Sequence, residues 1–162
     1  MSEKNLILDT TYILPLFGID IIITPNFKNE LKILWKDGIP GFKIFLPSVC
    51  LIETMFKLNR EYRNKKDVTI LKRYPQILPT IITSKVVEIE HPQLNPTASK
   101  IAIVIRHENL TDLMDCWIAA SAVALKGILL TEDKDLKEIL KKIPETKTII
   151  TWSWKDLQKN IK

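Results

Sequence analysis

Four carboxylates stand where they could do chemistry. Asp9 ends the apolar run "LIL", and Asp133 follows the run "ILLT" by two residues. Glu53 and Asp115 lie inside the apolar segments "PSVCLIETMF" and "DLMDCWIAASA". A carboxylate taken out of water needs a partner, and carboxylates that cluster repel unless they bind protons or a cation. These residue types therefore predict a cation site.

The chemistry that such a site supports is phosphodiester hydrolysis. Oxygen ligands at this density suit Mg²⁺ or Mn²⁺, with water and substrate phosphate in the remaining positions. The ion lowers the pKa of a bound water and stabilises the attacking and leaving oxygens. We predict that Asp9, Asp115 and Asp133 bind the metal and that Glu53 orients a ligand, a second ion or the water.

Each carboxylate also has a purely structural explanation. Asp115 could act in a helix cap with Asp112 or lie in the favourable first turn of its helix. Asp133 could be the N-cap of the next helix, and Glu53 could pair with Lys57 four residues later. The acid after the first strand could cap the helical turn that follows. The context of all four together favours chemistry.

Strand-like and helical segments alternate along the chain. The expected strands are 5–8, 43–46, part of 78–92, 128–131 and 147–151. The expected helices are a short turn at 10–17 and helices at 27–37, 48–65, 67–78, 95–110, 111–127, 132–143 and 153–159. Helical crossovers imply a parallel sheet covered on both faces, with ligands beyond the carboxyl ends of the strands. Thr111 or Asp112 is expected to cap the helix that ends at Gly127.

Composition limits the class of protein. The 162 residues, 46% hydrophobic, fit one domain with one core. A net charge of +5 favours a polyanionic partner without identifying one. Cys50 and Cys116 lie in apolar patterns without a disulfide framework, and we find neither a signal peptide nor a membrane-spanning run. We expect a soluble, cytoplasmic protein with no membrane contact.

Three longer stretches carry a family resemblance. "LILDTTYIL", "LPSVCLIETMFKL" and "LTDLMDCWIAASAVALKGILLTEDKDL" resemble, in order and spacing, the PIN-domain family of metal-dependent ribonucleases. The positions that match the family's motifs are Asp9 with Thr10 and Thr11, Glu53, Asp115, and Thr131 with Asp133. Asp135 is a neighbour that could share the task of the last motif. Thr10 or Thr11 could bind a phosphate or water, although we favour a helix cap for one of them.

The resemblance implies a fold, an activity and partners. It implies an α/β fold, a three-layer α/β/α sandwich with a central parallel sheet of about five strands, over a single PIN-like domain at 1–162. It further implies a Mg²⁺ or Mn²⁺ site, endonucleolytic cleavage of RNA, a VapC-type toxin role with an antitoxin partner, and a homodimer. The chain is longer than a typical toxin of that type, with insertion-like segments near 19–42 and 67–95.

A basic run follows Glu53 on the same expected helix. "KLNREYRNKKD" supplies Lys57, Arg60 and Arg63, which could lead an RNA backbone towards the metal. Cations that complement a helix dipole at a solvated helix end explain the run equally well.

Three other functions fit the sequence less well. A haloacid-dehalogenase-like phosphatase needs a second acid two residues after the first, where this chain has Thr11. A receiver-type signalling domain needs an acidic pair after its first strand, and "LDTTY" offers one acid. A non-catalytic RNA-binding or assembly protein could retain the PIN fold, but the presence of all four carboxylates favours the enzyme.

Overall fold

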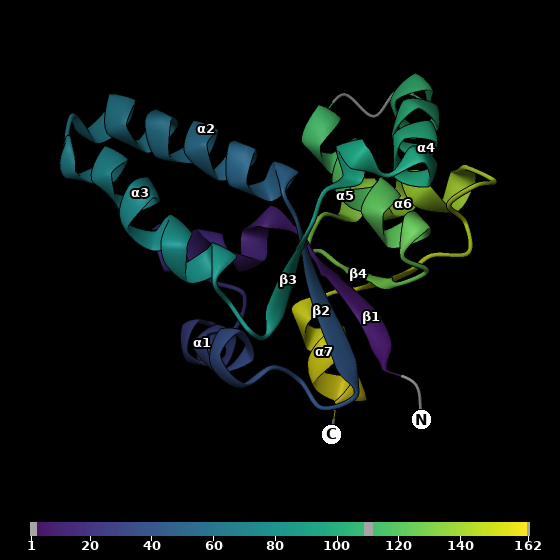
Figure 1. The fold of residues 1–162 in the computed structure, drawn as a ribbon, viewed down its shortest axis with the longest axis horizontal. Coiled ribbons are helices and arrows are strands. Elements are labelled where there is room, and N and C mark those ends of the chain that lie inside the picture. The colour runs from purple at the N-terminus through teal and green to yellow at the C-terminus, as the bar shows by residue number, and fades with distance from the viewer. Residues whose placement is uncertain (1–2, 109–111, 162) are drawn as a thin grey trace.

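The computed structural model describes residues 3–108 and 112–161 and contains one parallel five-stranded sheet (Figure 1). Its strand order is β3-β2-β1-β4-β5. The strands are β1 Lys4–Leu8, β2 Phe42–Pro47, β3 Val87–Glu90, β4 Ile128–Leu130 and β5 Ile150–Trp152. Leu6 of β1 pairs with Ile44 of β2 on one side and with Ile128 of β4 on the other. β1 is therefore the central strand, and its end lies between the ends of β2 and β4.

Helices connect and cover the strands. The α-helices in the described residues are α1 Phe27–Asp37, α2 Val49–Lys65, α3 Thr69–Ile82, α4 Pro96–His107, α5 Leu113–Ala124, α6 Lys134–Lys142 and α7 Trp154–Asn160. The 3-10 helices are η1 Thr10–Tyr12, η2 Leu14–Phe17 and η3 Pro92–Leu94. The short helix expected at 10–17 is thus two 3-10 turns, which end at Gly18 in the left-handed region (φ 75°).

The sheet is covered on both faces. Leu6, Ile7 and Leu8 are fully buried, as a central strand between two helical layers requires. Trp154 of α7 packs edge-on against Phe27 of α1, with ring centroids 5.0 Å apart. Because crossovers are right-handed, the return from β3 to β4 puts α4 and α5 on the opposite face from α1. The predicted three-layer α/β/α sandwich is confirmed.

The α5–β4 connection passes very close to β1. A Cβ placed on Gly127 would lie 2.2 Å from Ile7 Cδ1 and 2.9 Å from the Asn5 carbonyl oxygen. A larger residue would push the two segments apart, so glycine at this position keeps α5 packed against the sheet. This packing positions the first turn of α5, where Asp115 lies.

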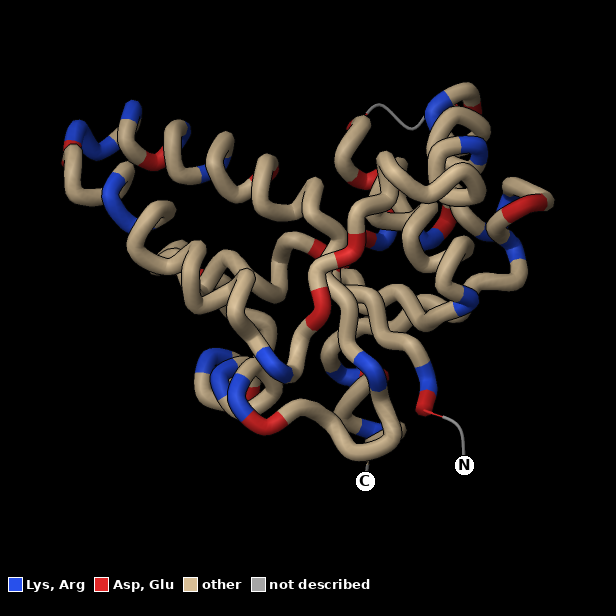
Figure 2. The backbone as a smooth tube through the Cα atoms, viewed as in Figure 1, with Lys and Arg blue, Asp and Glu red and all other residues tan. Residues whose placement is uncertain are grey.

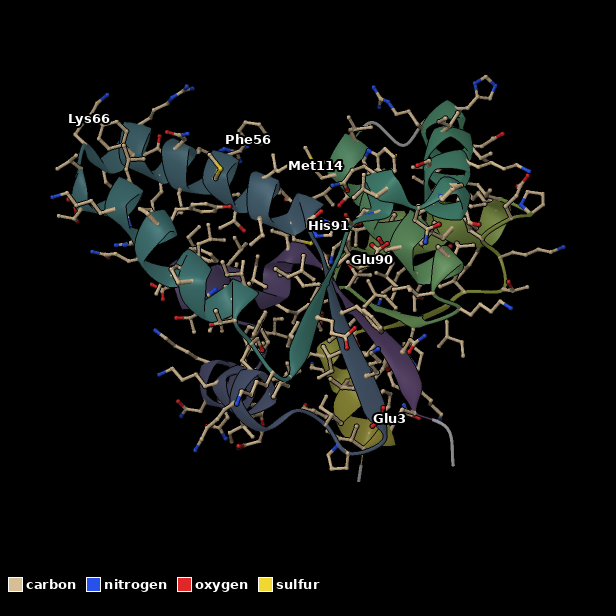
Figure 3. All side chains as sticks on the ribbon, viewed as in Figure 1. Glu3, Phe56, Lys66, Glu90, His91 and Met114 are labelled. Atoms are coloured by element: carbon tan, nitrogen blue, oxygen red, sulfur yellow. The ribbon has the colours of Figure 1, made fainter. Side chains whose placement is uncertain are left out.

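Helices α2 and α3 form a two-helix arm that projects beyond the sheet (Figure 1). Lys66 marks its outer end and Phe56 lies about midway along α2 (Figure 3). The helix predicted at 67–78 corresponds to α3. Its predicted end at residue 78 is wrong, because α3 continues through Pro75 and Pro79 to Ile82. Burial of its apolar side chains outweighs the local cost of the prolines, which is about 3 kcal/mol in an isolated helix interior.

The strand expected within 78–92 is correspondingly shorter. It begins only at Val87, and it forms the sheet edge beyond β2. This edge strand lies in the segment near 67–95 that was expected to be insertion-like, and α1 lies in the segment near 19–42. α1 contributes Phe27, Leu31 and Leu34 to the core. The assignment of 1–162 to a single domain with insertions stays a prediction.

None of the helices within residues 3–108 and 112–161 is both long and apolar enough to cross a membrane.

Candidate metal centre

Asp9 lies at the carboxyl end of β1 and is almost fully buried. Thr131, just after β4, donates a hydrogen bond from Oγ1 to Asp9 Oδ2 at 2.6 Å. Thr131 Oγ1 in turn accepts from the Asp133 backbone N–H at 3.1 Å. Burial raises the pKa of Asp9 to about 6, against the opposing effect of the Thr131 hydrogen bond. The ends of β1 and β4 are therefore joined through a carboxylate that resists ionisation.

Glu53 reaches the same place from the second turn of α2. Its Oε2 accepts a hydrogen bond from Thr10 Oγ1, and its Oε1 lies 3.0 Å from Lys57 Nζ. The helix cap favoured for a threonine is not made by Thr10, because this hydroxyl points to Glu53 and η1 has no side-chain cap hydrogen bond. Both Glu53 oxygens thus have protein partners.

Asp115 completes the group from the first turn of α5. Burial raises its pKa to about 7, and the neighbouring charges of Asp9 and Asp112 add to this effect. Asp112 caps α5, since its Oδ1 accepts from the backbone N–H groups of Met114 at 2.8 Å and Asp115 at 3.4 Å. The alternative cap, Thr111, lies outside the described residues.

Ligand oxygens of Asp9, Glu53 and Asp115 all lie within 4.8 Å of one another. They border a pocket of about 230 Å³ where the carboxyl ends of the strands meet; in Figure 2, red segments of the chain gather in this region. The residues that line it are Asp9, Thr10, Thr11, Glu53, Lys57, Asp112, Asp115 and Asp133. Such an oxygen-rich donor set fits a hard divalent cation such as Mg²⁺ or Mn²⁺.

Asp133 lies in the pocket wall but outside the three-carboxylate group. Its Oδ1 accepts a hydrogen bond from the Leu136 backbone N–H at 2.9 Å, so it is the N-cap of α6. Asp135, in the first turn of α6, is exposed and does not line the pocket. The metal-ligand role of Asp133 and the contribution of Asp135 stay predictions.

The three residues predicted to contact RNA lie at different distances along α2 from the pocket. Lys57 lines the pocket, whereas Arg60 and Arg63 are exposed further along the arm. Thr11 also lines the pocket, although the sequence analysis assigned it no definite chemical role. The signal for it was its place in the Asp-Thr-Thr motif after β1.

The fold and the site together define an α/β sandwich protein with an acidic pocket at the carboxyl edge of its parallel sheet. The PIN domain family model matches residues 6–142, which spans all of the predicted site. The chain belongs to the PIN-domain family. No match was found among curated proteins.

Solved structures share the fold at low sequence identity. A chain of the crystal structure of VapBC2 from Rickettsia felis bound to a DNA fragment from their promoter is 18% identical, with a TM-score of 0.60. The match covers 93% of this chain and 98% of that one. A chain of FitAB bound to the IR36 DNA fragment is 15% identical, with a TM-score of 0.57, and the match covers 91% and 94% of the two chains.

Proposed function

We propose that this protein is a Mg²⁺- or Mn²⁺-dependent endoribonuclease that hydrolyses RNA phosphodiester bonds at the pocket described above. The observation that carries the proposal is the convergence of Asp9, Glu53 and Asp115 within 4.8 Å. Membership of the PIN-domain family supports it, because PIN domains are nucleases in general. Asp133 is included as a fourth acidic residue at the pocket wall.

The protein groups have distinct tasks in this mechanism. Asp9 and Asp115 bind the divalent ion, which when bound activates a water and stabilises charge on the phosphate oxygens. Thr131 holds the Asp9 carboxylate in place through its hydroxyl, as Thr10 does for Glu53. With its orientation fixed in this way, Glu53 accepts a hydrogen bond from the attacking water and removes its proton.

RNA reaches the pocket along α2. Lys57, Arg60 and Arg63 lie on α2, the helix that carries Glu53. Such cations bind the phosphate backbone without reading its sequence, so affinity should fall steeply with salt.

The toxin role is also a proposal. VapBC2 and FitAB, which share the fold, are two-component complexes bound to DNA. By analogy, we propose that this chain is the toxin component of a toxin–antitoxin pair, that it forms a homodimer and that it acts in the cytoplasm.

The test is cleavage of a labelled single-stranded RNA in the presence of Mg²⁺ or Mn²⁺. Wild type should cut it internally, and Asp9→Asn and Asp115→Asn should not. Equal cleavage by all three proteins would reveal a contaminating nuclease. Metal-dependent RNA binding without cleavage would instead favour the non-catalytic RNA-binding protein.

A further inference from the structure

The acidic pocket has a cation in its own wall. Among the described residues that line it, Lys57 is the only one with a positive charge. It shares the pocket lining with five carboxylic acids, from Asp9, Glu53, Asp112, Asp115 and Asp133. The Lys57 side chain is 37% exposed, so its ammonium lies at the rim, between the pocket and solvent.

The protein itself uses many of the carboxylate oxygens. Oε1 of Glu53 is paired with Lys57, and its Oε2 accepts from Thr10. Asp112 and Asp133 each use Oδ1 to cap a helix.

The oxygens that remain open are few. Asp9 uses Oδ2 for Thr131. Within the described part of the chain, both carboxylate oxygens of Asp115 accept no hydrogen bond, whereas the Asp9 carboxylate also interacts with the backbone N–H groups of Thr10 and Thr11. That set suffices for one divalent ion completed by water, but a second ion would have to take Glu53 away from Lys57.

We propose that Lys57 supplies the second positive charge of this site, so that the pocket holds one divalent ion and the ammonium binds a non-bridging oxygen of the RNA phosphate. An ammonium has three N–H donors, so the ion pair with Glu53 leaves donors for a phosphate oxygen. A lysine binds phosphate as a compact point charge, which suits a position at the rim. The phosphate contact rests on the proposed function, whereas the number of bound ions does not.

A matched control is present on the same helix. Glu61 and Lys65 form an i,i+4 ion pair of the same type, with 2.6 Å between Oε1 and Nζ, and neither residue lines the pocket. Glu61 Oε2 also lies 3.7 Å from Arg73 Nη1. Lys57→Gln and Lys65→Gln therefore remove the same charge and the same kind of helix contact. Only the first alters the pocket.

The first measurement counts bound Mn²⁺ by isothermal titration calorimetry and by electron paramagnetic resonance of the free ion. Wild type and Lys65→Gln should bind one ion, and Lys57→Gln should bind two. Two ions in wild type, or one in Lys57→Gln, would overturn the proposal. The count decides this point even if the protein cleaves no RNA.

The second measurement is the single-turnover rate of RNA cleavage at saturating protein. Lys57→Gln should slow it about 100-fold, the usual loss for one charge-stabilising donor, and Lys57→Arg should recover much of it. Lys65→Gln should match wild type, and circular dichroism checks that each variant folds. A wild-type rate in Lys57→Gln would rule out the phosphate contact, while inactive wild type would refute the proposed nuclease itself.

Discussion

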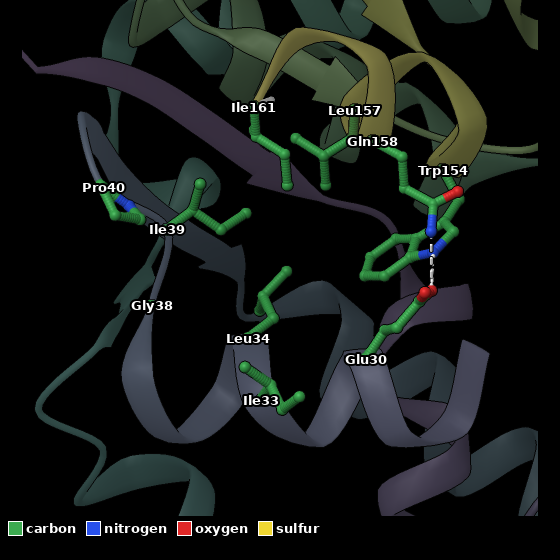
Figure 4. A pocket seen from close by; sticks show the side chains of 10 residues that line it. All are labelled: Glu30, Ile33, Leu34, Gly38, Ile39, Pro40, Trp154, Leu157, Gln158 and Ile161. Atoms are coloured by element: carbon green, nitrogen blue, oxygen red, sulfur yellow. Dashed lines mark hydrogen bonds between the residues drawn. The ribbon is translucent and has the colours of Figure 1, made fainter. Parts of the chain in front are cut away.

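Two pockets of this protein contain carboxylates with different neighbours: N–H donors in one pocket and other carboxylates in the other. Between α1 and α7, Glu30 accepts hydrogen bonds on Oε2 from Trp154 Nε1 at 2.9 Å and Gln158 Nε2 at 2.8 Å (Figure 4). Around it, Ile33, Leu34 and other apolar residues line a pocket of about 560 Å³. In the acidic pocket, by contrast, carboxylates face one another within a smaller space of about 230 Å³.

The comparison shows that pocket size does not locate the chemistry. Glu30 is a hydrogen-bond acceptor with donors in place, and it fastens α7 to α1. Asp9 and Asp115 lie in the protein interior beside like charges, and burial, with a smaller contribution from those charges, raises the pKa of both. A carboxylate paired with N–H donors stabilises structure, whereas carboxylates that repel one another can be stabilised by a cation.

The largest expected effect is on catalysis. Asp9→Asn or Asp115→Asn should lower the RNA cleavage rate by about 10³-fold or more, because an amide removes the charge that holds the ion. Glu30→Gln should leave the rate unchanged, since Glu30 lies in the other pocket. Single-turnover assays in Mg²⁺ compare the three variants. Equal losses in Glu30→Gln would mean that the two pockets are not functionally distinct.

The next effect is on stability without metal. Both raised pKa values mean that the folded protein binds protons more tightly than the unfolded chain. This stabilisation is full below about pH 4 and is lost as the pH rises through about 6 for Asp9 and 7 for Asp115. The Asp9 contribution is at most ~3 kcal/mol.

Urea unfolding in EDTA at several values between pH 5 and pH 8 measures this loss. Asp9→Asn should lose less stability over that range than wild type, and Glu30→Gln should follow wild type. Identical pH dependence in wild type and Asp9→Asn would show that Asp9 does not cause this loss of stability.

Metal should reverse that trend. At a concentration about 100 times its Kd, Mn²⁺ should add about 2.7 kcal/mol, or roughly 5–10 °C in Tm for a protein of this size. The shift should grow from pH 5.5 to pH 8, because protons compete with the ion for Asp9 and Asp115. Differential scanning fluorimetry should show the shift in Glu30→Gln but not in Asp115→Asn. A wild-type increase in Tm in Asp115→Asn would show that the metal binds at another site.

The smallest effect is expected in the apolar pocket. Glu30→Ala leaves the N–H donors of Trp154 and Gln158 without their acceptor, which should cost about 1–3 kcal/mol of unfolding free energy. Urea unfolding measures the cost, and Mn²⁺ should still raise the Tm by the wild-type amount. Loss of the metal response in Glu30→Ala would show that the pockets are coupled.

Much of the fold was predictable because its signals are local. The amphipathic spacing of 27–37 before Gly38 gave α1 with the bounds that the structure has. The short apolar runs gave β1 and β4 to within a residue or so. The helix predicted at 67–78 corresponds to α3, but its end at Ile82 was not predicted, because Pro79 argues locally against a helix while the packing of α3 depends on distant residues.

The site was predictable in part for the same reason. The cap that Asp133 makes on α6 is a hydrogen bond between residues only three positions apart. The sequence could therefore suggest this cap, but it could not exclude a second role for Asp133. The pairing of Glu53 with Lys57 is equally local. That this pair borders the acidic pocket depends on where α2 begins relative to β1.

The sequence by itself determined which carboxylates follow strands or lie in apolar helices, and that the strands run parallel. Only the tertiary structure decided that Asp9, Glu53 and Asp115 form the close group and that Asp133 stands beside it. The reason is that sheet order and helix docking set the distances between residues more than a hundred positions apart in the sequence. Local preferences fix the elements, but burial of the shared core fixes how they meet.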